Sequence, residues 1–277
     1  MTLIVVLLAA GFAAVVGLVL LRLYDQRVDR VTWQWLARRQ AETPQPFDPG
    51  MIADLPEPAR RYLGYAILPG APLWTVAEID MTGTFALGDQ ATPKEQPMKA
   101  RQILALPYGF IWAMQAGPIG GSDGFGAKGS WTRFRLFGVL PVARSGGSED
   151  HLRSAFARLV AEAVFWTPAA VLPGPGIHWE SAGPDTARLT VTQGKLCQSV
   201  DLTLAADGRP LSMVMPRWSN ANPEKRWQIQ SFGAVFGDHR PVGGFRLPFD
   251  VQAGNLFGTA DWFAFFKARV SAIRFAK

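Results

Sequence analysis

The chain begins with an uninterrupted apolar run of nineteen residues, LIVVLLAAGFAAVVGLVLL, from Leu3 to Leu21. As an α-helix this run would be about 28 Å long at 1.5 Å per residue, close to the hydrocarbon thickness of a bilayer. A core helix of a soluble protein is a poor alternative, because nineteen apolar residues without a polar stripe would need burial on every side. The run therefore predicts a membrane-spanning helix.

The residues around this run predict how it is used. Only Met1 and Thr2 precede it, whereas a cleaved signal peptide has a basic region before a shorter apolar one, so we expect an uncleaved anchor. Arginine and aromatic side chains favour the headgroup region, and both kinds follow the run. By the positive-inside rule we expect a single-pass protein of the inner, cytoplasmic membrane, with its main domain in the cytoplasm. The residues concerned are Arg22, Arg27, Arg30, Arg38, Arg39, Tyr24, Trp33 and Trp35, with Asp25 and Asp29 among them.

Composition narrows the choice of partners. The chain has 277 residues, 48% of them hydrophobic, which is enough for one domain beyond the anchor. Its net charge of +6 is spread thinly outside the segment after the apolar run, which favours a membrane surface over nucleic acid. The single cysteine, Cys197, excludes an intrachain disulfide and a cysteine-based zinc cluster, and its strand-like surroundings predict a small core or near-core residue.

Prolines divide the chain into an anchor and one domain. The segment ETPQPFDP, from Glu42 to Pro49, should end the first helix near Ala41. We therefore expect an anchor with a juxtamembrane helix at 1–41 and a single domain at 42–277. Within the domain, helical spacing predicts a short helix near 54–67, with Asp54 as its N-cap, and a central helix near 148–172.

Beyond Pro72 the pattern becomes that of strands. Residues 187–216 alternate apolar and polar side chains, and Gln193-Gly194 and Asp207-Gly208 stand where hairpins would turn. We find no repeat of fixed period and no alternation of strands with helices. The expected fold class is therefore α+β and mostly β: an antiparallel sheet with one central helix, preceded by one transmembrane helix.

Two motif searches indicate no cofactor and no metal. Residues 124–129, GFGAKG, match the dinucleotide-binding spacing, but a strand pattern follows them instead of a helix, so we expect a glycine-rich hairpin. His151, His178 and His239 are far apart and belong to no zinc or hydrolase motif.

Glu162 is the one carboxylate within the apolar pattern RLVAEAVFWTPAAVLP of the central helix. On a helical wheel it lies at the flank of the apolar face. Acid–base catalysis would need a second titratable group fixed beside it, and the pattern supplies none. We expect a structural ion pair with Arg217 or Arg226, and a hydrolase or isomerase that uses Glu162 is the alternative.

Four segments together resemble an uncharacterised bacterial family whose members usually carry an N-terminal membrane segment. This resemblance covers nearly the whole domain, and the family in turn resembles the outer-membrane lipoprotein carriers. It implies a curved antiparallel sheet that cups helices and an apolar cavity, although a fold does not fix a function. Where the family pattern reads Trp-Leu-Pro-Ser-Ala, this chain has Trp166 to Ala170, WTPAA, and so lacks the serine hydroxyl. The segments are LPEPARRYLGYAI, GPIGGSDGFGAKGS, EAVFWTPAAVLP and GGFRLPFDVQ.

The aromatic content, ten Trp and eighteen Phe, is the last indication. Aromatic residues fill cores by default, but a curved sheet rich in them can leave a cavity for an acyl chain. The sequence thus favours a membrane-anchored protein that binds membrane lipids or another hydrophobic small molecule, rather than an enzyme. A ligand-free, membrane-tethered interaction or assembly module is the alternative, and no particular protein partner is indicated. The expected ligand contacts are Phe156, Leu159, Glu162, Ala163, Trp166 and Arg217.

Overall fold

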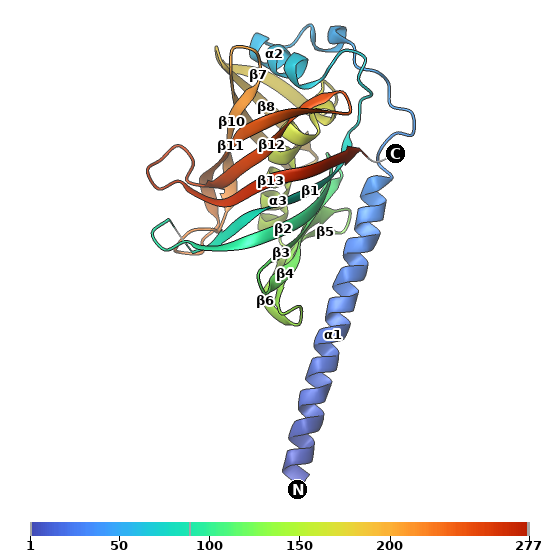
Figure 1. Cartoon of the computed structure of the whole chain (residues 1–277), viewed down its shortest axis with the longest axis vertical. Helices are drawn as coiled ribbons and strands as arrows, with labels where there is room; N and C mark the ends of the chain where they lie inside the picture. The colour runs from blue at the N-terminus through green and yellow to red at the C-terminus, as the bar shows by residue number, and fades with distance from the viewer. Residues whose placement is uncertain (1, 89, 276–277) are drawn as a thin grey trace.

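The computed structural model describes residues 2–88 and 90–275 (Figure 1). Within them, a single antiparallel sheet of thirteen strands curves around one central helix, and a long N-terminal helix extends away from the domain. The expected fold class is confirmed, because the chain is mostly β and carries one long apolar helix at its N-terminus.

The long helix, α1, spans Thr2–Ala37. Its apolar half is long and apolar enough to cross a membrane, and none of that segment is buried against the domain. The helix ends four residues before the expected Ala41. The cause is Gln40, whose side-chain oxygen accepts hydrogen bonds from the backbone N–H groups of Thr75 (2.9 Å) and Val76 (3.0 Å) and so draws the chain to the start of the sheet.

The order of the thirteen strands in the sheet follows their order in the chain, with one exception. Neighbours in the sheet are consecutive in the chain, except where β1 pairs with β13 to join the two halves. The edge strands of the described sheet are consequently β6 and β7, which follow each other in the chain. The strands are β1 (Val76–Leu87), β2 (Lys94–Ala105), β3 (Gly109–Ala116), β4 (Ile119–Gly126), β5 (Gly129–Leu136), β6 (Leu140–Gly146), β7 (Ile177–Gly183), β8 (Thr186–Gln193), β9 (Leu196–Leu204), β10 (Pro210–Ser219), β11 (Gln228–Val242), β12 (Phe245–Asn255) and β13 (Phe263–Phe275).

The central helix α3, Glu149–Trp166, connects these two edges and therefore crosses the concave side of the sheet. Ser148 caps it, since the serine hydroxyl oxygen accepts a hydrogen bond of 3.1 Å from the backbone N–H of His151. Pro168 prevents further α-helix, and the rest of the predicted 148–172 segment holds the short 3₁₀ helix η2, Pro168–Val171.

The smaller helices cover one end of the sheet. Helix α2, Glu57–Ala66, lies inside the predicted 54–67 segment and follows the 3₁₀ helix η1, Pro49–Ile52. The expected N-cap, Asp54, is wrong: the cap position is Pro56, whose extended backbone delays the helix until Glu57.

Two of the expected strand features are confirmed, and one prediction in this region is wrong. The three strands predicted within 187–216 are β8, β9 and β10, and the glycine-rich segment 124–129 is the hairpin between β4 and β5. Cys197 is exposed instead of buried. In β9 the even-numbered positions from Gln198 to Leu204 face inward, which puts Cys197 on the outer surface.

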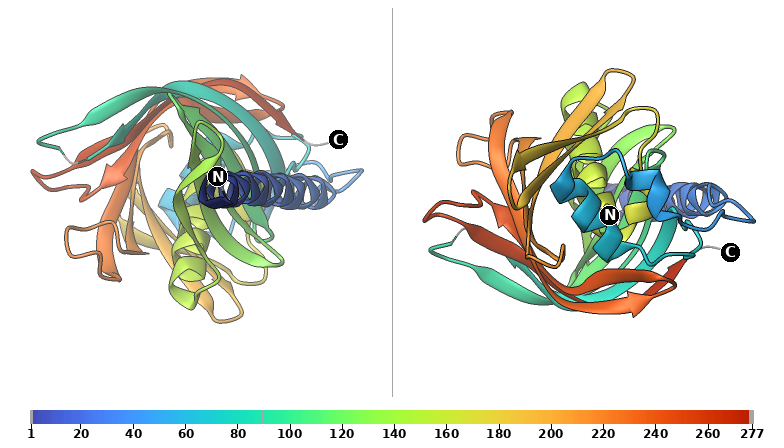
Figure 2. Two further views of the ribbon diagram at one scale, coloured as in Figure 1. Left: turned by 90° about the horizontal axis from the view of Figure 1, so that it is seen from below. Right: turned by 90° about the horizontal axis from the view of Figure 1, so that it is seen from above.

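The outer, convex face of the sheet is covered by the second half of α1. Leu36 of α1 is fully buried with Ile103 and Ile111, and Trp33 and Trp35 pack beside them. These two tryptophans, which the sequence places near headgroups, therefore contact protein. Helix α1 contacts β2, β3 and β4 from this side and α3 contacts the same strands from the concave side, so this part of the sheet is covered on both faces (Figure 2).

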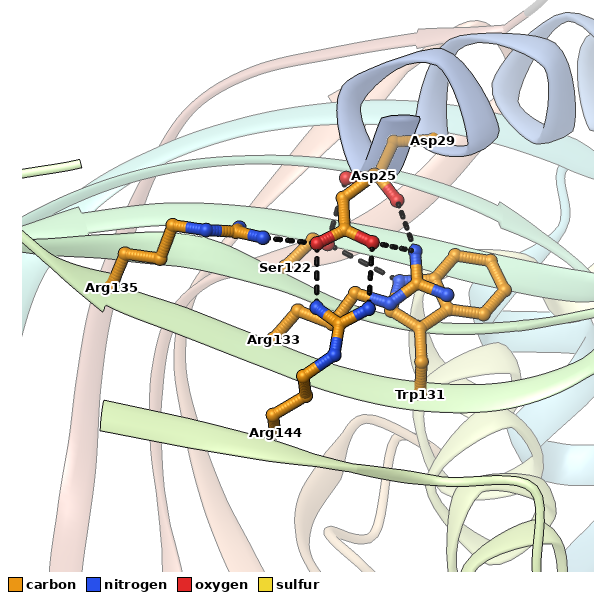
Figure 3. A network of polar contacts seen from close by, with 7 residues as sticks. All are labelled: Asp25, Asp29, Ser122, Trp131, Arg133, Arg135 and Arg144. Carbon is orange, nitrogen blue, oxygen red and sulfur yellow. Dashed lines mark hydrogen bonds and ion pairs between the residues drawn. The ribbon is translucent and has the colours of Figure 1, made fainter. Parts of the chain in front are cut away.

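A buried ion cluster fixes α1 to the sheet (Figure 3). Asp25 of α1 is 2% exposed and meets three arginines from the β5–β6 hairpin: Arg133 at 3.3 Å, Arg144 at 2.7 Å, and Arg135 in direct contact. One helical turn on, Asp29 accepts a hydrogen bond of 2.7 Å from the Ser122 hydroxyl. The position of α1 relative to the edge of the sheet is thereby determined.

We predict that Asp25→Ala weakens this docking strongly. Removing the shared carboxylate leaves three arginines facing each other, and breaking a buried ion pair in this way costs about 3–5 kcal/mol. The free energy of unfolding, measured in detergent micelles with urea, should fall by that order. The control is Arg27→Ala, which alters an exposed residue of the same helix. Equal stability of the two variants would contradict the docking role of Asp25.

Candidate functional site

The concave side of the sheet is incompletely filled by α3. A cavity of about 460 Å³ remains between this helix and the inner faces of both halves of the sheet. That volume lies within the range of about 300–1,000 Å³ that is typical of small-molecule sites.

Aromatic rings make up much of the cavity wall. Trp112 of β3 is at its centre, with ring centroids 6.0 Å from Phe85, 6.3 Å from Phe134 and 6.0 Å from Phe266. These side chains come from β1, β5 and β13, so strands far apart in sequence build one apolar surface. Met114, Met213, Phe232, Val251 and Phe265 extend it.

Helix α3 contributes one face to the cavity, formed by residues spaced three and four apart. Its members are Arg158, Ala161, Glu162 and Phe165, with Trp166 beside them. Arg158 and Glu162 are the charged members. They lie at the end of the cavity where its charged side chains gather, which we call the polar end.

Arg158 and Glu162 form the first part of this polar end. The Arg158 Nε donates to Glu162 Oε1 at 2.6 Å, and its Nη1 donates to Asp123 Oδ2 at 3.0 Å. The amide of Gln102 donates to the second oxygen of Glu162. Both carboxylate oxygens of Glu162 are therefore engaged, and Arg158 is paired with two carboxylates.

Arg217 of β10 is the second cation at this end, and its situation differs. Within the described part of the chain, no hydrogen bond or ion pair engages its guanidinium, and its Nε is buried without an acceptor. The guanidinium lies 4.9 Å above the ring of Phe232. Burial, and to a lesser extent the nearby Arg158, lowers the pKa of Arg217 to about 10, so it stays charged at neutral pH.

A second, more polar cavity of about 570 Å³ adjoins the first. The two share Asp123, Thr132, Arg158, Arg217 and Phe265 as wall residues, so these side chains lie at the junction. His151 lines the polar cavity, with its ring nitrogens 2.7 Å from the Ser130 hydroxyl and 3.1 Å from the Thr132 hydroxyl. Burial lowers the pKa of His151, which keeps it neutral at physiological pH.

The sequence-predicted contacts divide into two groups. Glu162, Trp166 and Arg217 lie together on the cavity wall. Phe156, Leu159 and Ala163 lie elsewhere on α3, where they are almost completely buried in the core and line neither cavity.

The partner of Glu162 is also different from the one expected. Neither Arg217 nor Arg226 pairs with it, because Arg158 occupies that position from one turn earlier on the same helix. The spacing of Arg158 and Glu162, four residues apart, was a signal for this pair in the sequence. Asp123 and Gln102 carried no such signal, since both come from distant strands.

Within the described residues, no group of three or more histidine, cysteine, aspartate or glutamate side chains is placed to hold a metal ion. The cavity is an apolar chamber whose polar end carries two arginines and two carboxylates, with Arg158 in the ion pairs and Arg217 outside them.

We predict a structural role for Glu162. Glu162→Gln removes the ion pair with Arg158 and should lower the free energy of unfolding by about 1.5–3 kcal/mol, the range for a hydrogen bond to a charged group. Glu180→Gln, at an exposed carboxylate, is the control and should change little. Chemical unfolding of both variants measures the difference, and a Glu162→Gln protein as stable as the control would contradict this role.

Two solved structures are similar to this chain over most of its length. The chain is similar to the LolA superfamily protein NE2245 from Nitrosomonas europaea, with 9% sequence identity, a TM-score of 0.44, and coverage of 78% of this chain and 91% of that one. It is also similar to a domain named for outer-membrane lipoprotein sorting from Vibrio parahaemolyticus, with 12% identity, a TM-score of 0.36, and coverage of 73% and 86%. These are distant similarities of fold.

A search of curated proteins found no significant match. The model of a family of unknown function, DUF6544, matches residues 45–268, and the chain therefore belongs to this family.

Proposed function

We propose that this protein is a membrane-anchored binding protein for a single-chain amphiphile with an anionic head, such as a fatty acid or a lysolipid. The observation that carries the proposal is the position of Arg217: a half-buried guanidinium at the end of an apolar cavity, with a buried Nε and no hydrogen bond or ion pair to any of the described residues. A buried charge without a partner is costly, and a ligand that brings its own anion removes that cost.

The charge distribution around the junction supports an anionic head. Arg158 already bonds to Asp123 and Glu162, whereas Arg217 keeps its hydrogen-bond donors free. Arginine presents its donors in a planar fork that matches carboxylate and phosphate groups. Trp112 Nε1, on a ring of the cavity wall, is a further buried donor without an acceptor.

The apolar walls support a tail of one chain. A ligand that reaches Arg217 with its head would extend its tail past Trp112 and Phe134, along surface with few polar atoms. Burial of such a tail supplies about 0.8 kcal/mol per methylene group, so it would dominate the affinity. Arg217 would then select the head.

In this proposal the apolar half of α1 is an anchor in the inner membrane, and the domain faces the cytoplasm. The support is the length and exposure of that half and the arginines that follow it. An interaction module without a ligand would have no use for a cavity that ends at an unpaired cation.

We predict that Arg217 determines the choice of head group. Arg217→Met should weaken binding of a fluorescent fatty acid by about ten- to a hundredfold, because a charged hydrogen bond is lost, but leave the matching fatty alcohol unaffected. Fluorescence titration of the detergent-solubilised protein measures both. Binding of the fatty acid should also decline as the pH rises through about 10, where Arg217 loses its charge.

Two tryptophan substitutions provide the steric test. Ala161→Trp fills the cavity and should abolish binding of both probes in a folded protein. Ala163→Trp, two residues along the same helix, enters the filled core and should instead destabilise the protein by about 1–3 kcal/mol. Undiminished uptake by a stable Ala161→Trp protein would refute the cavity as the binding site.

We predict a cytoplasmic domain from the arginines after the apolar run. A reporter fused at Lys277 should be active when it requires the cytoplasm and inactive when it requires the periplasm. The opposite pattern would place the domain outside.

A further inference from the structure

The hairpin that joins β5 to β6 is apolar over eight residues, LFGVLPVA, from Leu136 to Ala143. Its large side chains are exposed on the protein surface: Phe137 is 75% exposed, Leu140 52% and Val142 52%. No residue of this stretch has a charged or hydrogen-bonding side chain. Apolar surface concentrated in this way on a soluble domain marks a contact with a membrane or a partner.

The position of the hairpin identifies the membrane as that contact. The Arg22 guanidinium lies against Gly138 at the hairpin turn, so closely that a side-chain carbon on Gly138 would come within 2.8 Å of Arg22 Nη1. Arg22 is the first charged residue after the apolar run Leu3–Leu21. A basic residue at that place marks the level at which a spanning helix leaves the hydrocarbon. The hairpin turn is therefore level with the membrane surface, and Figure 1 shows this end of the domain beside the middle of α1.

A second apolar turn lies next to the first. The chain between β3 and β4, from Ala116 to Ile119, reads AGPI, and the Pro118 carbonyl accepts a hydrogen bond of 2.8 Å from the N–H of Phe137. The two turns together form one apolar rim at this end of the sheet.

This rim has a fixed orientation. Arg133, Arg135 and Arg144, which flank the hairpin, all meet Asp25 of α1 (Figure 3). Because Asp25 is one helical turn beyond Arg22, any membrane that holds α1 also holds the hairpin at its surface.

The rim is continuous with the apolar cavity. Three rim residues also form part of the cavity wall: Ile119 from the β3–β4 turn, and Val142 and Ala143 from β6. Val142 and Ala143 are exposed, so the cavity reaches the protein surface beside them.

We propose that the β5–β6 hairpin inserts into the leaflet from which α1 emerges and forms the entrance through which a membrane lipid reaches the cavity. The insertion follows from the position of the hairpin alone. The role as an entrance rests on the proposed function, since it needs a cavity that accepts lipid.

Insertion is tested by a fluorescent label at the hairpin. Cys197, the single cysteine, is replaced by serine, and NBD is attached to Leu140→Cys in the full chain, in nanodiscs of phosphatidylcholine and phosphatidylglycerol. The control is Leu211→Cys, an exposed apolar position at the start of β10, three residues after Gly208, which lies against Arg61 of α2 at the other end of the domain. We expect blue-shifted emission at Leu140, quenched by spin-labelled lipids, and water-like, unquenched emission at Leu211. Unquenched emission at both positions would overturn the insertion. A blue shift at Leu140 that appears only when a nanodisc holds two copies of the protein would also overturn it, because a second copy would then be what covers the hairpin.

The entrance is tested by the route that the ligand takes. The double variant Phe137→Asp and Leu140→Asp should take up a fluorescent lysolipid from the nanodisc bilayer about tenfold more slowly, because two apolar side chains no longer enter the leaflet. Its affinity for a short-chain fatty acid added from solution should be unchanged. Equal rates for variant and wild type would overturn the entrance. No binding of the soluble probe by either protein would instead refute the proposed function, while the quenching result would still decide the insertion.

Discussion

One helix has to cover the concave face of a thirteen-stranded sheet. Because β6 and β7 are the two edges of the described sheet and are consecutive in the chain, α3 must pass from one edge to the other across the concavity. A single helix about 10–12 Å wide cannot fill a surface of that extent, and the adjacent layer of aromatic side chains leaves a chamber beside it. The cavity is thus a consequence of topology, and the face of α3 that carries Arg158, Ala161 and Glu162 sets its chemical character.

On the outer face of the same sheet α1 packs against β2, β3 and β4, and this second contact fixes the position of the cavity relative to the apolar run of α1. Apolar packing around Leu36 holds the upper part of the helix, and the Asp25 cluster holds the part nearest to the apolar run. A helix that only tethered the domain would need neither contact. With both, the domain has one orientation relative to α1, and the end of the sheet that bears the β5–β6 hairpin lies against Arg22, the first charged residue after the apolar run.

Local patterns in the sequence were enough to predict the elements. The apolar run predicted α1 and alternation with turn residues predicted β8 to β10, whereas the central helix was expected to reach residue 172 and α3 ends at Trp166. Even the Arg158–Glu162 pair was available from its spacing along a helix. Cys197 shows the weak point of such patterns, because a strand's alternation does not say which of its two faces is buried.

The arrangement of the site depends on contacts between residues that are far apart in the sequence. Asp25 meets residues more than a hundred positions away, and the isolation of Arg217 is a property of everything that packs around it. No local pattern carries such facts, since they follow from the register of distant strands. For the same reason Phe156, Leu159 and Ala163 were expected at the cavity: a helical wheel identifies an apolar face but not whether core or empty space lies against it.

The central claim is that the cavity holds one anionic single-chain lipid at Arg217. Native mass spectrometry tests this claim most directly. The protein is extracted in mild detergent and released from the detergent micelle without unfolding, so that a bound lipid stays with it. The account predicts a wild-type mass that exceeds the polypeptide by one such lipid, and an Arg217→Met protein of bare polypeptide mass. A wild-type protein that carries no bound lipid, or an Arg217→Met protein that retains the same one, would contradict it.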